Sequence, residues 1–135
     1  LELGTTNDPE LVADGWFHMP TLVVDVPADA RVVEVEQFGP VLPIVAFDSE
    51  DEAIALANGT EYGLAASVWS ADHDRAWRVA ERIEAGTVMI NHHNVFVIGG
   101  DGPQTGWKQS GLGPELGIEG VLELMETSVI TDRTR

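Results

Sequence analysis

The stretch G106-W-K-Q-S-G-L-G113 holds three glycines and the chain's only lysine, a composition that could serve phosphate binding. A phosphate-binding loop needs Ser or Thr directly after its lysine and a long helix that begins there. Here Lys108 is followed by Gln109, the glycine spacing fits neither a P-loop nor a dinucleotide fingerprint, and no long helix is predicted to follow. The sequence therefore argues against a phosphate site in this loop.

Other reactive side chains also have simpler explanations. His92 and His93 are neighbours on an extended segment and would point to opposite faces, so no metal site is predicted. No nucleophile elbow of the G-x-S-x-G type is present. The acids between Asp48 and Glu52 stand where a helix N-terminus favours negative charge. What remains is E36-Q-F-G-P40, in which an acid and an aromatic residue precede a Gly-Pro turn.

Strand and helix patterns alternate along the chain, which favours an α/β fold with a mostly parallel sheet and flanking helices. We treat residues 1–135 as a single partial domain. Ser49 followed by Glu52 is a capping-box pattern at the start of one helix. The predicted strands are 21–26, 41–47 (buried), 65–70, 87–91 and a closing strand at about 125–131; the predicted helices are 49–58, 76–83 and about 117–124.

The composition is that of a globular chain with an acidic surface. Its 135 residues are 44% hydrophobic and 22% charged, and the formal net charge is −16, which would repel nucleic acid. The apolar runs are too short to cross a bilayer, so we expect no membrane association and a cytoplasmic location. The absence of cysteine excludes disulfides and thiolate nucleophiles within these residues.

Five ordered blocks resemble the NAD(P)-dependent aldehyde dehydrogenases. The resemblance covers nearly all of this chain and about the last third of the family's catalytic domain, including a terminal oligomerisation strand. The blocks are G15-W-F-H-M-P-T21, E36-Q-F-G-P40, N58-G-T-E-Y-G-L64, G86-T-V-M-I-N91 and G106-W-K-Q-S-G-L-G113.

The resemblance implies roles for four residues and a cofactor, NAD or NADP. Glu36 matches a glutamate that binds the nicotinamide ribose hydroxyls, and Phe38 matches a phenylalanine beside the nicotinamide. Asn91 and Phe96 match the part of the family that lines the aldehyde entrance. Core packing is the alternative for both phenylalanines. The loop containing Lys108 matches an architectural crossover whose glycines permit unusual backbone angles.

The family's chemistry needs a cysteine thiolate, which this chain lacks. By resemblance, that cysteine and the general-base glutamate belong to sequence upstream of Leu1, so we expect the chain to be inactive alone. We also expect a homo-oligomer or association with a missing N-terminal part. An interaction module and a degenerate remnant are the alternatives; Gln104, Thr105 and Pro114, which depart from the family pattern, favour the remnant mildly.

Overall fold

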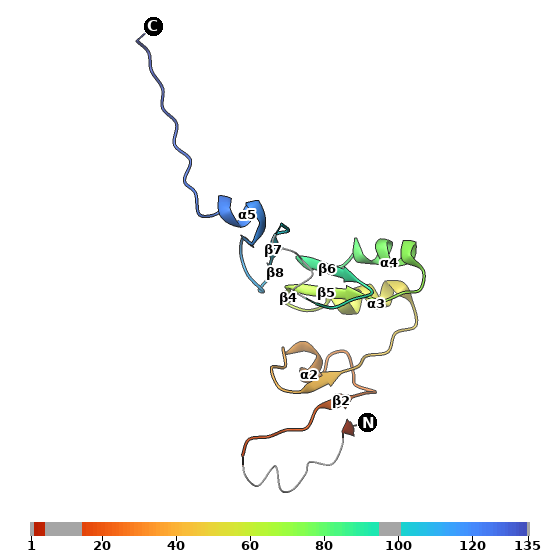
Figure 1. Ribbon diagram of the computed structural model, residues 1–135. Coiled ribbons are helices and arrows are strands. Elements are labelled where there is room, and N and C mark those ends of the chain that lie inside the picture. Colours follow the sequence, from red (N-terminus) through yellow and green to blue (C-terminus); the bar gives the residue numbers. More distant parts are fainter. Residues whose placement is uncertain (1, 5–14, 95–100, 135) are drawn as a thin grey trace. The chain divides into compact units, whose positions relative to one another are not determined.

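The computed structural model describes residues 2–4, 15–94 and 101–134, with the backbone alone for 2–4 (Figure 1). The chain divides into two compact units, Leu1–Leu56 and Ala57–Arg135, and we describe each by itself. Each unit combines helices with small sheets that include one parallel strand pair, which confirms the predicted α/β class. The single partial domain stays a prediction.

The first unit contains a three-stranded sheet in the order β1-β2-β3. Strand β1 (Glu2–Gly4) pairs antiparallel with β2 (Thr21–Val23), and β2 pairs parallel with β3 (Val41–Pro43), so that Leu22 lies opposite Leu42. A single helical turn, α2 (Arg31–Glu34), lies between β2 and β3 in sequence and was not predicted. This unit therefore carries the E36-Q-F-G-P40 segment on the connection that leads into β3.

Both strands of the parallel pair are shorter than predicted. Asp25 has a φ of 56°, in the left-handed region, which ends the extended backbone after β2. After Pro43, the Ile44 N–H still donates to the Val23 carbonyl at 2.7 Å, but β3 extends no further. The segment 41–47 was predicted to be buried, but Leu42 and Phe47 are 60% and 56% exposed. A sheet face is buried only where another layer covers it, which sequence periodicity cannot reveal.

Helix α3 (Glu50–Asn58) begins where the capping pattern predicts. The Ser49 hydroxyl accepts the backbone N–H of Glu52 at 3.2 Å, and the Glu52 carboxylate accepts the backbone N–H of Asp48 at 2.8 Å. In a standard capping box the glutamate accepts the N–H of the cap residue. Here Glu52 accepts the N–H of Asp48, the residue before the cap residue Ser49. These contacts satisfy backbone donors that have no partner within the helix.

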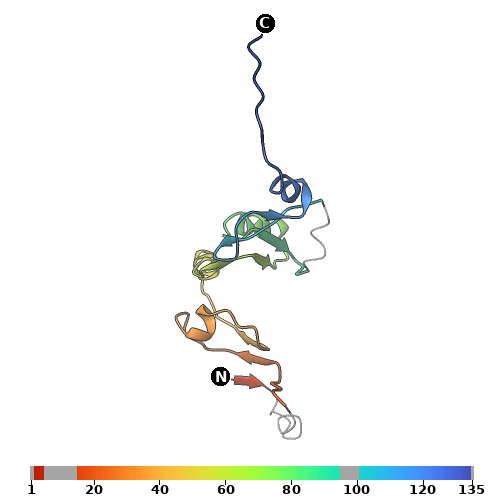
Figure 2. The ribbon, with the colours of Figure 1, turned by 90° about the vertical axis from the view of Figure 1, so that its left-hand side faces the viewer.

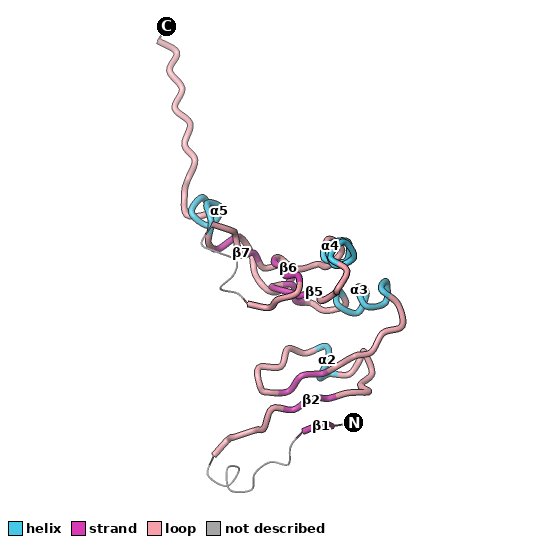
Figure 3. The backbone as a smooth tube through the Cα atoms, turned by 45° about the vertical axis from the view of Figure 1, so that its right-hand side comes forward, coloured by secondary structure: helices cyan, strands magenta, loops and turns pink. Residues whose placement is uncertain are grey.

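The second unit is built on a strand, helix, strand motif. Strand β5 (Ala65–Val68) pairs parallel with β6 (Thr87–Ile90), and α4 (His73–Ala80), which connects them, contacts both strands (Figure 3). Ala76 on α4 and Met89 on β6 are buried, with 0% and 4% exposure. Helix α4 begins three residues before the predicted Ala76, because the Asp72 side chain accepts the N–H of Arg75 at 3.0 Å.

Short antiparallel pairs complete this unit. Strand β4 (Tyr62–Gly63) pairs with β8 (Trp107–Lys108), and β7 (Gln104–Thr105) pairs with β9 (Pro114–Glu115). Helix α5 (Gly117–Leu122) follows β9 and agrees with the predicted short helix. Strands of two residues are too short to show a hydrophobic periodicity, so they could not be predicted from it.

The predicted closing strand at 125–131 does not form in this single chain. Residues 125–134 have neither helix nor strand assignment, and they run as an extended tail beyond α5 (Figure 2). Val129 and Ile130 are 83% and 93% exposed. A strand exists through ladder hydrogen bonds to a neighbour, and the described chain offers this tail none. Its role in oligomerisation stays a prediction. Among the described helices, none has the length and apolar character needed to cross a membrane.

Candidate functional site

Backbone hydrogen bonds hold the E36-Q-F-G-P40 segment of the first unit at both ends. On one side, the N–H of Val35 closes the turn of α2 by donating to the Arg31 carbonyl at 2.9 Å. On the other side, the Pro40 carbonyl accepts the N–H of Thr21 at 2.7 Å and so joins the segment to β2. The Gln37 side chain donates back to the Val35 carbonyl at 2.7 Å. The segment is thus a short loop with fixed ends.

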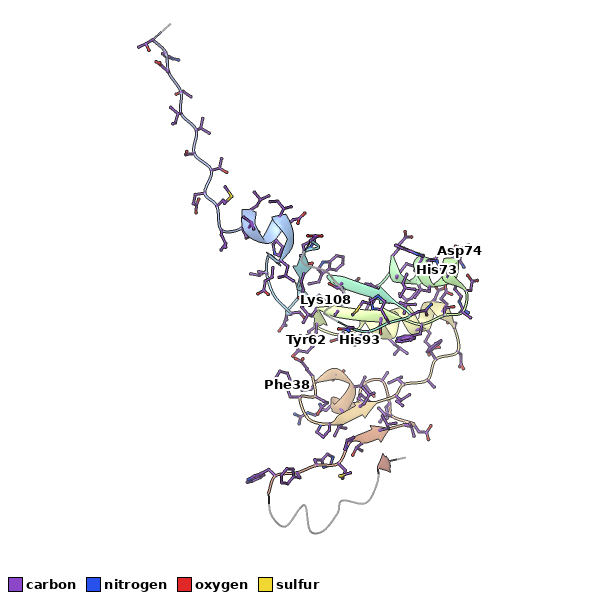
Figure 4. The ribbon with its side chains drawn as sticks, viewed as in Figure 1. Phe38, Tyr62, His73, Asp74, His93 and Lys108 are labelled. Carbon is purple, nitrogen blue, oxygen red and sulfur yellow. The ribbon has the colours of Figure 1, made fainter. Side chains whose placement is uncertain are left out.

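The two candidate cofactor residues on this loop are exposed. Phe38 is 95% exposed, and Figure 4 shows its ring standing away from the loop. Glu36 is also exposed. An exposed carboxylate can accept two hydroxyl donors, and an exposed ring can stack on a flat heterocycle, so these residue types fit a nicotinamide riboside. The core-packing alternative for Phe38 does not hold within the described residues.

In the second unit, the glycine-rich loop is tied down by Lys108 (Figure 4). The Lys108 ammonium donates to the backbone carbonyls of Asn58 at 2.7 Å and Thr60 at 3.1 Å. It also forms an ion pair with Glu84, whose Oε2 lies 2.8 Å from Nζ. All three ammonium protons therefore have acceptors, and the contacts join the end of α3, the segment before β4 and the segment before β6.

The Asn58 side chain completes this cluster, which we call the Lys108 clamp (Asn58, Glu84 and Lys108). Its Nδ2 donates to the Arg82 carbonyl at 2.8 Å, and its Oδ1 accepts the Glu84 N–H at 2.9 Å. No structural role for Asn58 or Glu84 was predicted from the sequence. The clamp uses the lysine for architecture, as the resemblance implies, and leaves it no free proton for a phosphate.

Close backbone approach explains why glycine occupies position 86. A Cβ added there would lie 1.6 Å from the Thr105 carbonyl oxygen, far inside van der Waals contact. Gly86 also donates its N–H to the Gly63 carbonyl at 3.0 Å. Position 86 therefore brings the start of β6 against both β4 and β7, and any side chain would force them apart.

Asn91, predicted to line the aldehyde entrance, holds two segments together at the end of β6. Its Oδ1 accepts the Ser70 N–H at 2.8 Å, and its Nδ2 donates to the Ser70 carbonyl at 2.9 Å. Its own N–H donates to the Val68 carbonyl at 2.9 Å, and its φ is 57°. This left-handed turn ends β6 and fixes the direction of the chain that follows. Phe96, the second predicted entrance residue, lies outside the described residues.

A shallow hollow of about 500 Å³ lies between α4 and β6. Trp77 and His73 of α4 line it with their rings edge to face, 6.4 Å between centroids, together with Met89 of β6. His92 also lines the hollow, whereas His93 does not. Over residues 15–94 and 101–134, no three His, Asp or Glu side chains are arranged to hold a metal ion.

The described residues thus present an exposed acid and an exposed ring on the loop after α2, and a strand end that the Asn91 side chain holds against Ser70. Glu36 and Phe38 belong to the first unit, and Asn91 belongs to the second. The sequence contains no cysteine.

Comparisons with known proteins agree on one family. The model of the aldehyde dehydrogenase family matches residues 1–130. Betaine aldehyde dehydrogenase of Bacillus subtilis is 44% identical over 129 residues, which are 96% of this chain and 26% of that protein. Geranial dehydrogenase of Castellaniella defragrans is 47% identical over 128 residues, 90% of this chain and 26% of that protein.

Solved structures give the same result. The crystal structure of Staphylococcus aureus betaine aldehyde dehydrogenase in complex with NAD+ is 43% identical in sequence, with a TM-score of 0.80. The similarity covers 90% of this chain and 24% of that one. The chain thus spans about a quarter of the length of the relatives that it matches.

Proposed function

The chain belongs to the aldehyde dehydrogenase family, and from that premise we propose that it forms the C-terminal portion of an NAD(P)-dependent enzyme that oxidises an aldehyde to a carboxylic acid. The proposal covers the whole enzyme's activity, of which these residues supply one part. The names of the relatives, which include betaine aldehyde, geranial and succinate-semialdehyde dehydrogenases, support an aldehyde substrate without selecting one.

The exposed pair on the loop after α2 carries the proposal. Glu36 would accept hydroxyls of the nicotinamide ribose, and Phe38 would pack against the nicotinamide ring. When bound, NAD or NADP would supply the hydride acceptor. Because the loop is anchored at Val35 and Pro40, its two side chains can be held toward a ligand at low conformational cost.

Residues at the end of β6 would act on the substrate side. Asn91 would direct the chain toward the aldehyde entrance by holding Ser70, and Phe96 would contribute an apolar wall there. The nucleophilic thiol has to come from polypeptide outside these 135 residues, since they contain no cysteine. We therefore expect no aldehyde oxidation by the purified chain with NAD+ or NADP+.

A chimera tests the cofactor contact directly. Residues 1–130 would replace the matching segment of the Staphylococcus aureus betaine aldehyde dehydrogenase, and aldehyde-dependent reduction of NAD+ would be measured. We expect an active chimera in which Glu36→Gln raises the KM for NAD+ about tenfold, the value of one charge-assisted hydrogen bond. The matched control is Glu34→Gln on α2, also exposed, which should leave the KM unchanged.

Two results would contradict the proposal. One is an active chimera in which Glu36→Gln and Phe38→Ala both leave the KM for NAD+ and the kcat unchanged. The other is aldehyde oxidation by the purified chain itself, free of any second polypeptide, because that would need a nucleophile other than a thiol.

An interaction module is the second candidate, and the exposed tail favours it. Met125, Val129 and Ile130 are 62%, 83% and 93% exposed, and an apolar extended segment can add to the open edge of a sheet. We expect self-association that removal of residues 125–135 weakens, measured by analytical ultracentrifugation. A monomer at high concentration would argue against this candidate.

A further inference from the structure

Asn58 and Gly59 form the chain's one Asn-Gly pair, and they lie where α3 ends. In a flexible Asn-Gly peptide, the glycine nitrogen can reach the asparagine side chain, since glycine has no Cβ to hinder the approach. We propose that Asn58 is a site of spontaneous deamidation, protected while the Lys108 clamp is closed and converted when the clamp opens.

The reaction needs water and no other reagent. The backbone nitrogen of Gly59 forms a bond to Cγ of Asn58, and the Cγ–Nδ2 bond breaks. The proton from the Gly59 amide leaves with Nδ2 as ammonia, and a five-membered succinimide remains. Water then opens this ring at one of its two carbonyls, giving aspartate or isoaspartate without any oxidation or reduction. Gly59 is exposed, so water can reach the ring.

The native contacts oppose the first step. The attack requires Cγ of Asn58 to turn toward its own main chain, which breaks the 2.8 Å bond from Nδ2 to the Arg82 carbonyl and the 2.9 Å bond from Glu84 to Oδ1. The Asn58 carbonyl is also fixed by the Lys108 ammonium at 2.7 Å. A local opening of the clamp must therefore precede the chemistry.

The product cannot rebuild the clamp. An aspartate at position 58 can still accept the Glu84 N–H, but it has no proton for the Arg82 carbonyl at neutral pH. It also adds a negative charge to the last turn of α3, where the helix dipole disfavours one. Isoaspartate lengthens the main chain by one carbon as well. Each deamidated molecule has therefore opened its clamp at least once, and its clamp is weaker afterwards.

The test follows conversion of the Asn58 peptide by mass spectrometry at mildly alkaline pH, in native buffer and in concentrated urea. We expect the wild-type chain to convert at least about tenfold more slowly in native buffer, equivalent to an opening cost of about 1.4 kcal/mol. Lys108→Met should convert faster than wild type in native buffer and equally fast in urea. Gly59→Ala is the chemical control and should convert slowly in both.

Equal deamidation rates of the wild-type chain in native buffer and in urea would overturn the proposal. It would also be overturned if Lys108→Met kept its helical circular dichroism and was deamidated no faster than wild type in native buffer. If that variant does not fold, hydrogen exchange in the wild-type chain decides. The Glu84 N–H donates to Asn58 Oδ1, so its exchange rate and the deamidation rate should rise together as low concentrations of urea are added. Faster Glu84 exchange without faster deamidation would refute the link.

Discussion

Replacing Lys108 by methionine would test what holds the second unit together. Methionine keeps an unbranched apolar stem but removes the ammonium. Its loss would leave the carbonyls of Asn58 and Thr60 and the carboxylate of Glu84 without this donor. The Lys108 side chain is 24% exposed, so water can replace only part of what is lost. We expect a lower free energy of unfolding.

The ion pair of Lys108 and its two hydrogen bonds to carbonyls contribute different amounts to the free energy of unfolding. Glu84 is 53% exposed, and an ion pair in such a position contributes at most about 1 kcal/mol. A hydrogen bond from a charged donor contributes about 1.5–3 kcal/mol, and the two carbonyl bonds share one ammonium, so they do not add fully. The expected loss for Lys108→Met is about 2–4 kcal/mol, most of it from the carbonyl bonds.

Urea unfolding followed by circular dichroism measures this loss. Glu84→Gln should cost no more than about 1 kcal/mol, because it removes the ion pair and leaves the carbonyl bonds. Arg133→Met, which removes an exposed cation from the tail, should leave the unfolding midpoint unchanged. Equal losses for Lys108→Met and Glu84→Gln would show that the ion pair dominates, and this reasoning would be wrong.

Two further substitutions probe backbone geometry. Gly86→Ala places a Cβ against the Thr105 carbonyl and should lower the free energy of unfolding by about 3 kcal/mol or prevent folding of the second unit. Gly39→Ala, whose Cβ meets nothing within 4 Å, should lower it by less than about 1 kcal/mol in the same urea unfolding experiment. Asn91→Asp keeps the hydrogen bond from the Ser70 N–H but loses the one to the Ser70 carbonyl. The free energy of unfolding should fall by about 1–3 kcal/mol at neutral pH. Part of this loss should be recovered at acidic pH, where a protonated carboxyl can donate to the carbonyl. A pH-independent loss would contradict the role given to Nδ2.

Several elements could be predicted because their causes are local. Ser49 and Glu52 start α3 through contacts within four residues, and the Asp72 side chain caps α4 through a contact with Arg75, three residues later. The parallel pairing of β5 with β6 follows from a helix of suitable length between them. Glu36 and Phe38 are exposed on the loop after α2, and their role in cofactor binding stays a prediction.

Other features arise from contacts across long sequence separations. The two-residue strands β4 and β8 place Tyr62 opposite Lys108, and the Lys108 ammonium donates to carbonyls that lie 48 and 50 positions away in the sequence. The Asn58 contacts span 24 and 26 positions. The tail at 125–131 has a strand-like composition, yet it forms no strand without a neighbour. The hydrophobic periodicity of one segment does not indicate which distant segment it will contact.

The sequence by itself determined the family resemblance, the α/β class and the absence of a thiol, because these depend on residue identity and local order. Only the tertiary structure decided that Lys108 stabilises the fold, that position 86 admits no side chain and that Asn91 holds Ser70. Each of these facts depends on which backbone atoms folding brings within a few ångströms of one another, and residues far apart in the chain carry no local signal of that meeting.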